Sequence, residues 1–148
     1  MGTLRDLIEK ASGFAEAMFD PDDMLTPHII AEDADGGITV VALAVPGSDI
    51  DRYREMMQLR LLAEGKRRWC FFSEAWMAEY LKGGPATVEP VDHPERVEVV
   101  TFDAFDVPGN RRVAATRQIH RDGDNSRLLP LVMRPEPARY RPSIGVVV

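Results

Sequence analysis

Residues 66–81 read KRRWCFFSEAWMAEYL and contain both tryptophans, the only cysteine and two of the six phenylalanines of the chain. Each aromatic side chain buries about 150–250 Å² on folding, so a segment this rich in aromatic residues must contact much of the remaining structure. We therefore predict that the segment lies at the centre of the hydrophobic core. It carries no recognisable catalytic motif.

Two secondary structures fit this segment. In the first, residues 69–72 form a strand, Ser73 caps a helix, and Gly83 or Gly84 ends that helix. In the second, the segment is one long strand whose even-numbered residues, including Glu74 and Trp76, share one face, while the odd-numbered residues share the other. We favour the long strand, because residues 96–107 provide an antiparallel partner of matching length. One aromatic face of such a strand would then be left for another subunit.

Two helices are predicted outside this segment. The first covers residues 4–19, where apolar residues recur every three or four positions and Thr3 with Asp6 resembles a capping box. The second follows Ser48, with an acidic first turn and Gly65 as its stop. Its expected inner face consists of Ile50, Tyr53, Met57 and Leu61, with Met56 beside them.

The remaining elements are predicted to be strands. Residues 28–32 and 38–45 form a hairpin around Asp35-Gly36, and residues 96–107, 111–121 and 128–133 form a meander. The fold class is therefore α+β: a single domain of two amphipathic helices packed on a mainly antiparallel sheet of about six strands, in the order α-β-β-α-β-β-β-β. We place the domain at residues 1–138 and a C-terminal arm or strand at residues 139–148.

Composition limits the class of protein. The 148 residues are 45% hydrophobic and 28% charged, which is typical of one globular domain. No apolar run approaches the ~20 residues that cross a bilayer, and no signal-peptide pattern opens the chain. We expect a cytoplasmic protein with no membrane contact.

Charge is divided unevenly along the chain. Residues 1–110 carry 10 Lys and Arg against 21 Asp and Glu, whereas residues 111–148 carry 8 arginines against 3 acidic residues. The arginines could bind phosphate or nucleic acid. They could equally pair with the acidic part of the same domain or of a second subunit. We favour pairing, because the sequence pI is near 5.1 and no basic helix is present, so nucleic acid is not the expected partner.

The most informative candidate for a binding site is Glu74. A carboxylate buried among aromatic residues has a raised pKa and can act as a general acid or base, although such residues more often form an ion pair. Arg96 or Arg117, on neighbouring predicted strands, would supply the cation, and Trp76 and Tyr80 would line the same site. No catalytic residue is predicted.

Metal and cofactor sites are not predicted. The three histidines lack metal-ligand spacing, and the single cysteine excludes an internal disulfide. Cys70, between Trp69 and Phe71, is typical of a small buried hydrophobic residue rather than of a reactive thiol. The Asp-Gly segments are typical of turns and lack the calcium-loop pattern.

Three functions fit the sequence. The first is a small binding or scaffold protein that self-associates, or binds a protein partner, through an aromatic sheet face or the C-terminal arm. The second is a small-molecule-binding protein or hydrolase-like enzyme with a pocket around Glu74. The third is a nucleic-acid-binding accessory protein that uses the C-terminal arginines. We favour the first, and binding over catalysis.

Overall fold

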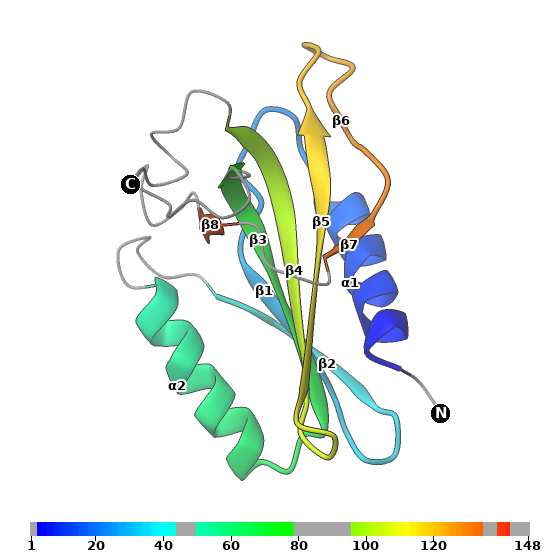
Figure 1. Ribbon diagram of the computed structural model, residues 1–148, viewed down its shortest axis with the longest axis vertical. Coiled ribbons are helices and arrows are strands. Elements are labelled where there is room, and N and C mark those ends of the chain that lie inside the picture. The colour runs from blue at the N-terminus through cyan, green and yellow to red at the C-terminus, as the bar shows by residue number, and fades with distance from the viewer. Residues whose placement is uncertain (1–2, 44–49, 79–95, 135–138, 143–148) are drawn as a thin grey trace, which may run out of the picture.

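A computed structural model describes residues 3–43, 50–78, 96–134 and 139–142. Two helices lie on opposite sides of one sheet (Figure 1). The helices are α1 (Leu4–Met18) and α2 (Ile50–Ala63), and the strands are β1 (His28–Glu32), β2 (Ile38–Ala42), β3 (Arg68–Ala78), β4 (Val97–Asp106), β5 (Arg111–His120), β6 (Arg127–Leu128), β7 (Val132–Arg134) and β8 (Arg139–Pro142).

The predicted fold class is confirmed. The sheet is antiparallel and its strand order is β2-β1-β3-β4-β5-β6, with β7 also pairing with β5 and β8 with β3. Its described residues form eight strands, whereas the sequence predicted about six together with a C-terminal arm or strand. The strand predicted at residues 128–133 is divided around Pro130, which cannot donate a backbone hydrogen bond, and residues 139–142 add a strand.

The long-strand interpretation of the aromatic segment is also confirmed. Strand β3 runs unbroken from Arg68 to Ala78 and pairs with β4 over ten residue pairs, from Arg68 opposite Asp106 to Met77 opposite Val97. Residues 79–81, including Tyr80, lie outside the described residues. Strand β3 is central because β4 lies on one side, while β1 and β8 share the other.

Alternate residues of β3 face the two helices. Cys70 and Phe72 belong to the core under α1, and Trp69 and Phe71 belong to the core under α2. All four are at most 2% exposed within this single chain, so at these positions β3 leaves no aromatic face for another subunit. The expectation of self-association through that face loses its support here.

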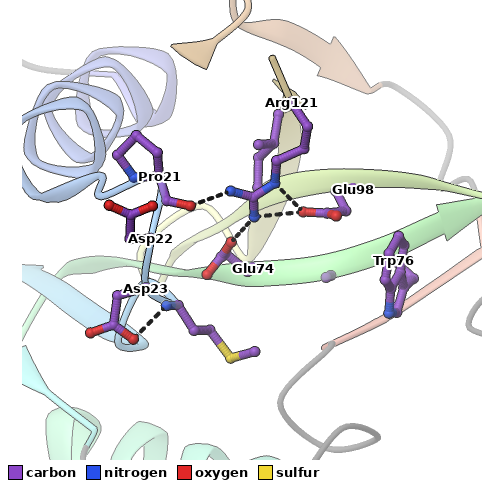
Figure 2. Close-up of a pocket in the computed structure, with 10 residues that line it drawn as sticks. Pro21, Asp22, Asp23, Glu74, Trp76, Glu98 and Arg121 are labelled. Carbon is purple, nitrogen blue, oxygen red and sulfur yellow. Dashed lines mark hydrogen bonds and ion pairs between the residues drawn. The ribbon is translucent and has the colours of Figure 1, made fainter. Parts of the chain in front are cut away.

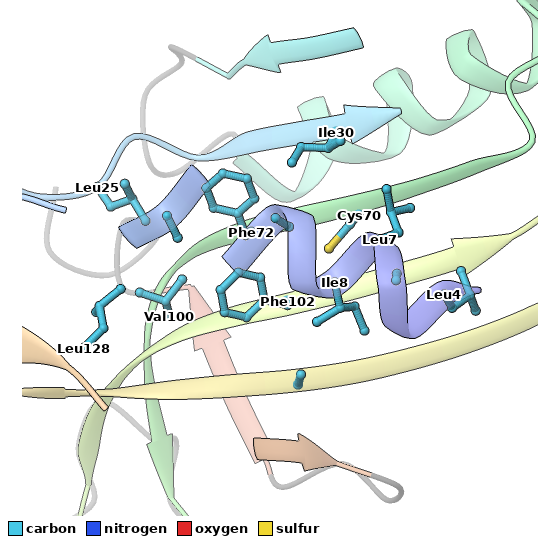
Figure 3. Close-up of a cluster of buried hydrophobic side chains, with 14 of the residues drawn as sticks. Leu4, Leu7, Ile8, Leu25, Ile30, Cys70, Phe72, Val100, Phe102 and Leu128 are labelled. Carbon is cyan, nitrogen blue, oxygen red and sulfur yellow. The ribbon is translucent and has the colours of Figure 1, made fainter. Parts of the chain in front are cut away.

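Helix α1 forms as its sequence predicts. The Thr3 hydroxyl accepts a hydrogen bond from the Asp6 backbone N–H (3.2 Å), and the Asp6 carboxylate accepts one from the Thr3 N–H (2.9 Å). This capping box pairs two backbone donors that would otherwise lack partners at the helix start. The apolar stripe of the helix then packs on β3, β4 and β5, around the stacked rings of Phe72 and Phe102, whose centroids lie 5.9 Å apart (Figure 3).

Helix α2 differs from its predicted orientation. Met57 and Leu61 are buried as expected, but Tyr53, predicted on the inner face, is exposed, as is Met56. The side chain of Ile50 lies outside the described residues. The prediction for Tyr53 was wrong because apolar residues lie all around this helix, including the exposed Leu59 and Leu62, so that periodicity alone could not fix one inner face.

The C-terminal strand pairs within the chain. Residues 139–142 of β8 lie antiparallel to residues 75–78 of β3, on the same edge that β1 occupies further along. Two arrangements of the arm were expected: pairing with the sheet of its own chain, or exchange between subunits. Residues 139–142 adopt the first. The predicted apolar end of the arm, residues 144–148, lies outside the described residues, as does the loop predicted between residues 82 and 94.

Candidate functional site: a cleft around Glu74

Glu74 lies on β3, on the α1 side of the sheet, beyond the C-terminal end of the helix. On one edge of β3, β1 pairs as far as Phe72 and β8 pairs from Ala75 onward. Residues 20–26, which follow α1, approach this edge between the two strands. The backbone N–H of Leu25 donates a hydrogen bond to Glu74 Oε2. The Glu74 side chain is only 7% exposed, so this bond satisfies a carboxylate oxygen that is largely removed from water.

Arg121 is the residue that connects this site. Its Nη2 lies 3.5 Å from Glu74 Oε1, and its Nε and Nη2 donate to Glu98 Oε2 at 3.0 and 2.7 Å. Its Nη1 donates to the Pro21 carbonyl at 3.0 Å. Figure 2 shows the guanidinium between these three groups. One side chain therefore ties the segment after α1 to β3 and β4.

A cleft of about 470 Å³ lies beside Glu74 and Arg121. This volume falls within the roughly 300–1,000 Å³ of small-molecule sites. Burial is the largest effect on the pKa of Glu74 and raises it, while the Leu25 N–H and the Arg121 guanidinium act in the opposite direction. The cleft is lined by Pro21, Asp22, Asp23, Met24, Glu74, Ala75, Trp76, Glu98, Ile119 and Arg121.

Trp76 lies two residues beyond Glu74 on the same face of β3, and it lines the cleft (Figure 2). Its indole Nε1 is buried and has no hydrogen-bond partner among the described residues. The Arg96 guanidinium lies 4.8 Å from the centroid of the Trp76 ring, within the range of a cation–π interaction. Arg96 thus contributes to the site by contacting Trp76.

The cation beside Glu74 is not Arg117, one of the two that the sequence suggested. Arg117 lies under α1, where it pairs with Glu16 at 2.7 Å and donates to the carbonyls of Leu128 and Leu129. The cation beside Glu74 is Arg121, which the sequence analysis counted only as one of the C-terminal arginines. A signal for it existed: residues four apart in an extended segment share a face, so Arg121, just beyond β5, continues the alternation that includes Arg117. Only the register of β5 on β4 distinguishes them.

Three of the eight C-terminal arginines pair with the acidic part of the same chain. Arg112 bonds to Asp103, Arg117 to Glu16, and Arg121 to Glu98. All three carboxylates come from residues 1–110, where the negative charge is concentrated. Intramolecular pairing therefore accounts for these arginines without a polyanion.

Other candidates from the sequence have structural roles. Cys70 is fully buried in the core under α1, and burial raises the pKa of its thiol. The ring of His28 stacks on Phe72, with centroids 5.4 Å apart. No three His, Cys, Asp or Glu side chains gather as a metal site within residues 3–43, 50–78, 96–134 and 139–142.

Comparisons with known proteins found no matching family model, no matching curated protein and no matching solved structure. Neither of the two described helices is long and apolar enough to cross a membrane. The chemistry of the cleft is therefore the only guide to what this site binds.

Proposed function

We propose that the protein binds a small organic cation in the cleft around Glu74. The observation that carries this proposal is a buried carboxylate that lines a cleft in which acidic groups outnumber basic ones. Asp22, Asp23, Glu74 and Glu98 line the cleft, Arg121 is the one cation among its described lining residues, and Arg96 lies against Trp76. Opposite charge raises the local concentration of a cationic ligand and stabilises it once bound.

Arg121 does not cancel this acidity towards a ligand. Its guanidinium already donates to Glu98 and Pro21 and lies 3.5 Å from Glu74. It thus fixes the positions of the carboxylates while Asp22 and Asp23 contribute further negative charge at the mouth of the cleft. A pre-arranged set of acceptors lowers the cost of ordering the site on binding.

Trp76 indicates two further properties of the ligand. Its ring already attracts one cation, Arg96, and a ligand ammonium group would gain from the same interaction. Its buried Nε1 is a donor without an acceptor among the described residues, and leaving such a group unpaired costs about 1–3 kcal/mol. A ligand that carries an oxygen acceptor near its cationic group would complete the site.

The test uses the Trp69→Phe variant, in which Trp76 is the only tryptophan and its fluorescence reports on this cleft. We expect choline to change the emission saturably at millimolar concentration. The uncharged isostere 3,3-dimethylbutan-1-ol should bind at least tenfold more weakly, because it lacks only the charge. An equal response to both compounds, or a saturable response to neither, would contradict the proposal.

Charge variants locate the effect. Glu98→Gln should weaken choline binding severalfold, because it removes one of the lining carboxylates. Glu9→Gln is the matched control: it removes the same charge from the exposed face of α1, outside the cleft, and should leave binding unchanged. Equal weakening by the two variants would indicate a non-specific effect of net charge.

The other two expected functions have less support. Self-association through an aromatic face of β3 is opposed by the burial of Trp69, Phe71 and Phe72 within the chain. Binding of nucleic acid is opposed by the pairing of Arg112, Arg117 and Arg121 with carboxylates of the same chain.

A further inference from the structure

A second and larger cleft lies on the opposite side of the sheet, beside α2. Its volume is about 750 Å³. It is separate from the Glu74 cleft, because Trp69 and Asp103 lie on the odd-numbered face of their strands whereas Glu74 and Glu98 lie on the even-numbered face. Its lining residues come from α2, β3, β4 and β5: Arg54, Glu55, Gln58, Leu59, Leu62, Trp69, Asp103, Phe105 and Arg112.

The polar part of this cleft is built around one buried carboxylate. Asp103 accepts hydrogen bonds from Arg112 Nε and Nη2, both at 2.7 Å, and its Oδ2 also accepts one from Arg54 Nη2. The Arg54 guanidinium lies 4.3 Å above the Phe71 ring, which holds it in place. Two guanidinium groups thus meet at the carboxylate of Asp103.

Two donors in the lining remain without acceptors. Arg54 Nε and the indole Nε1 of Trp69 are buried and have no hydrogen-bond partner among the described residues. Trp69 is 2% exposed, so its N–H is removed from bulk water. Both groups can only donate. A ligand that satisfies them must therefore supply oxygen acceptors, and the charged guanidinium favours an anionic oxygen.

The rest of the lining combines Phe105, Leu59 and Leu62 with two polar residues of α2, Glu55 and Gln58. Phe105 packs against the Trp69 ring, with centroids 5.4 Å apart, and the neighbouring helix presents Leu59 and Leu62, which are 68% and 46% exposed. A ligand that covers exposed leucines beside a cleft is stabilised by about 25 cal/mol per Å² of apolar surface removed from water. The cleft thus combines apolar walls with unpartnered donors.

We propose that this cleft binds an amphiphilic carboxylate, a molecule with one carboxylate group and an apolar chain or ring. The carboxylate accepts hydrogen bonds from Trp69 Nε1 and Arg54 Nε. The apolar part lies against Phe105, Leu59 and Leu62. The site is independent of the Glu74 cleft, so it can exist whether or not that cleft binds a cation.

The experiment uses octanoate as the anionic probe and octylammonium as the cation of equal chain length. The Trp76→Phe variant leaves Trp69 as the only tryptophan, so its fluorescence reports on this cleft alone. We expect octanoate to change the Trp69 emission saturably, with one site per chain by calorimetry, and to bind at least tenfold more tightly than octylammonium. Equal affinities, or no saturable response to octanoate, would overturn the proposal.

Two exposed residues of α2 provide a matched pair of variants. Leu59→Ala shortens a wall of the cleft and should weaken octanoate binding about fivefold or more, whereas Met56→Ala should not change it. Met56 is also exposed, at 57%, but does not line the cleft. Both positions face solvent, so neither variant should prevent folding.

The same pair of variants tests whether a second copy of the chain occupies this surface instead of a small ligand. A dimer through the outer face of α2 would be weakened by both substitutions, and sedimentation would detect it. A dimer that loses stability in both variants and excludes octanoate would contradict the proposal. Calorimetry on the Trp69→Phe variant tests the donor itself. The substitution removes Nε1 but keeps an aromatic ring, and it should weaken octanoate binding roughly two- to tenfold.

Discussion

Alternate residues of β3 face two environments that differ in how completely they are closed. Under α1, Cys70 and Phe72 belong to a continuous core of fifteen buried residues. Under α2, Trp69 and Phe71 belong to a smaller core of seven. The helix over the larger core exposes one large apolar side chain, Phe14, whereas the helix over the smaller core exposes Tyr53, Met56, Leu59 and Leu62.

The two faces also differ in hydrogen-bonding character. The cleft beyond α1 is lined by four carboxylates, which accept hydrogen bonds and favour cations. The cleft beside α2 contains two buried donors that have no partner among the described residues, and such donors favour anionic oxygen. A single strand thus supplies the floor of two clefts with opposite preferences, because its side chains alternate between the two faces. The helices α1 and α2 therefore make different contributions to stability and to ligand binding.

The largest expected effect concerns how firmly the two helices are packed. Leu7→Ala under α1 should lower the free energy of unfolding by about 4 kcal/mol, near the upper part of the range for buried leucines. Leu61→Ala under α2 should cost less, about 2 kcal/mol, because a helix beside an open cleft can move to fill the space. Both leucines are at most 2% exposed, so burial alone predicts equal costs. Urea unfolding of the two variants measures the difference, and equal losses would show that α2 is as rigidly held as α1.

The next effect concerns the buried charge beside α2. Asp103→Asn removes the carboxylate shared by Arg54 and Arg112 and leaves a guanidinium that cannot lose its proton. We expect a loss of about 3 kcal/mol, since breaking a buried pair by removing one partner costs roughly 3–5 kcal/mol and Arg112 is partly in solvent. Asp33→Asn, which breaks the half-exposed pair with Lys66, is the control and should cost about 1 kcal/mol or less. Thermal or urea unfolding distinguishes these values; similar losses would mean that Asp103 behaves as a surface residue.

Much of this fold follows from local sequence patterns. Helix α1 was predictable because its apolar spacing and its capping box agree. The length of β3 was predictable because β4 supplies a strand of similar length, although residues 73–81 alone also resemble a capped helix. The orientation of α2 was not predictable, because Tyr53, Met56 and Leu59 are as apolar as the residues that it buries.

The sites were only partly predictable. Glu74 and Trp76 follow from the composition of one strand, and the strand period places them on one face. Arg121 does not follow, since it lies just beyond β5 and the choice between it and Arg117 depends on tertiary register. The cleft beside α2 was missed entirely, because residues 54–62, 69, 103–105 and 112 meet only after folding.

A smaller effect tests the acidic cleft. Arg121→Gln removes the cation nearest to Glu74 but, unlike Asp103→Asn, leaves a group that can become neutral. Because the Arg121 charge lowers the pKa of Glu74, its removal should raise that pKa further. We expect a loss of about 1 kcal/mol at pH 8, small because Arg121 is partly exposed and its interactions are screened, and a smaller loss at pH 5, because lowering the pH favours the protonated form of Glu74. Urea unfolding at the two pH values measures this, and a loss independent of pH would show that Arg121 acts through its bonds to Pro21 and Glu98 alone.

The smallest effect isolates Glu74 itself. Burial raises its pKa in the folded state, so the folded protein binds this proton more tightly than the unfolded chain does. The resulting stability is fully present below the ordinary pKa of a glutamate, about 4.3, and is lost as the pH rises through the raised folded value. Glu74→Gln should therefore flatten the fall of the unfolding free energy between pH 4 and pH 8, while Glu9→Gln keeps the slope of the unaltered protein. Choline should oppose the same effect: a bound cation favours the ionised carboxylate, so its affinity should increase over that pH interval, and an affinity that is constant with pH would separate Glu74 from the cation site.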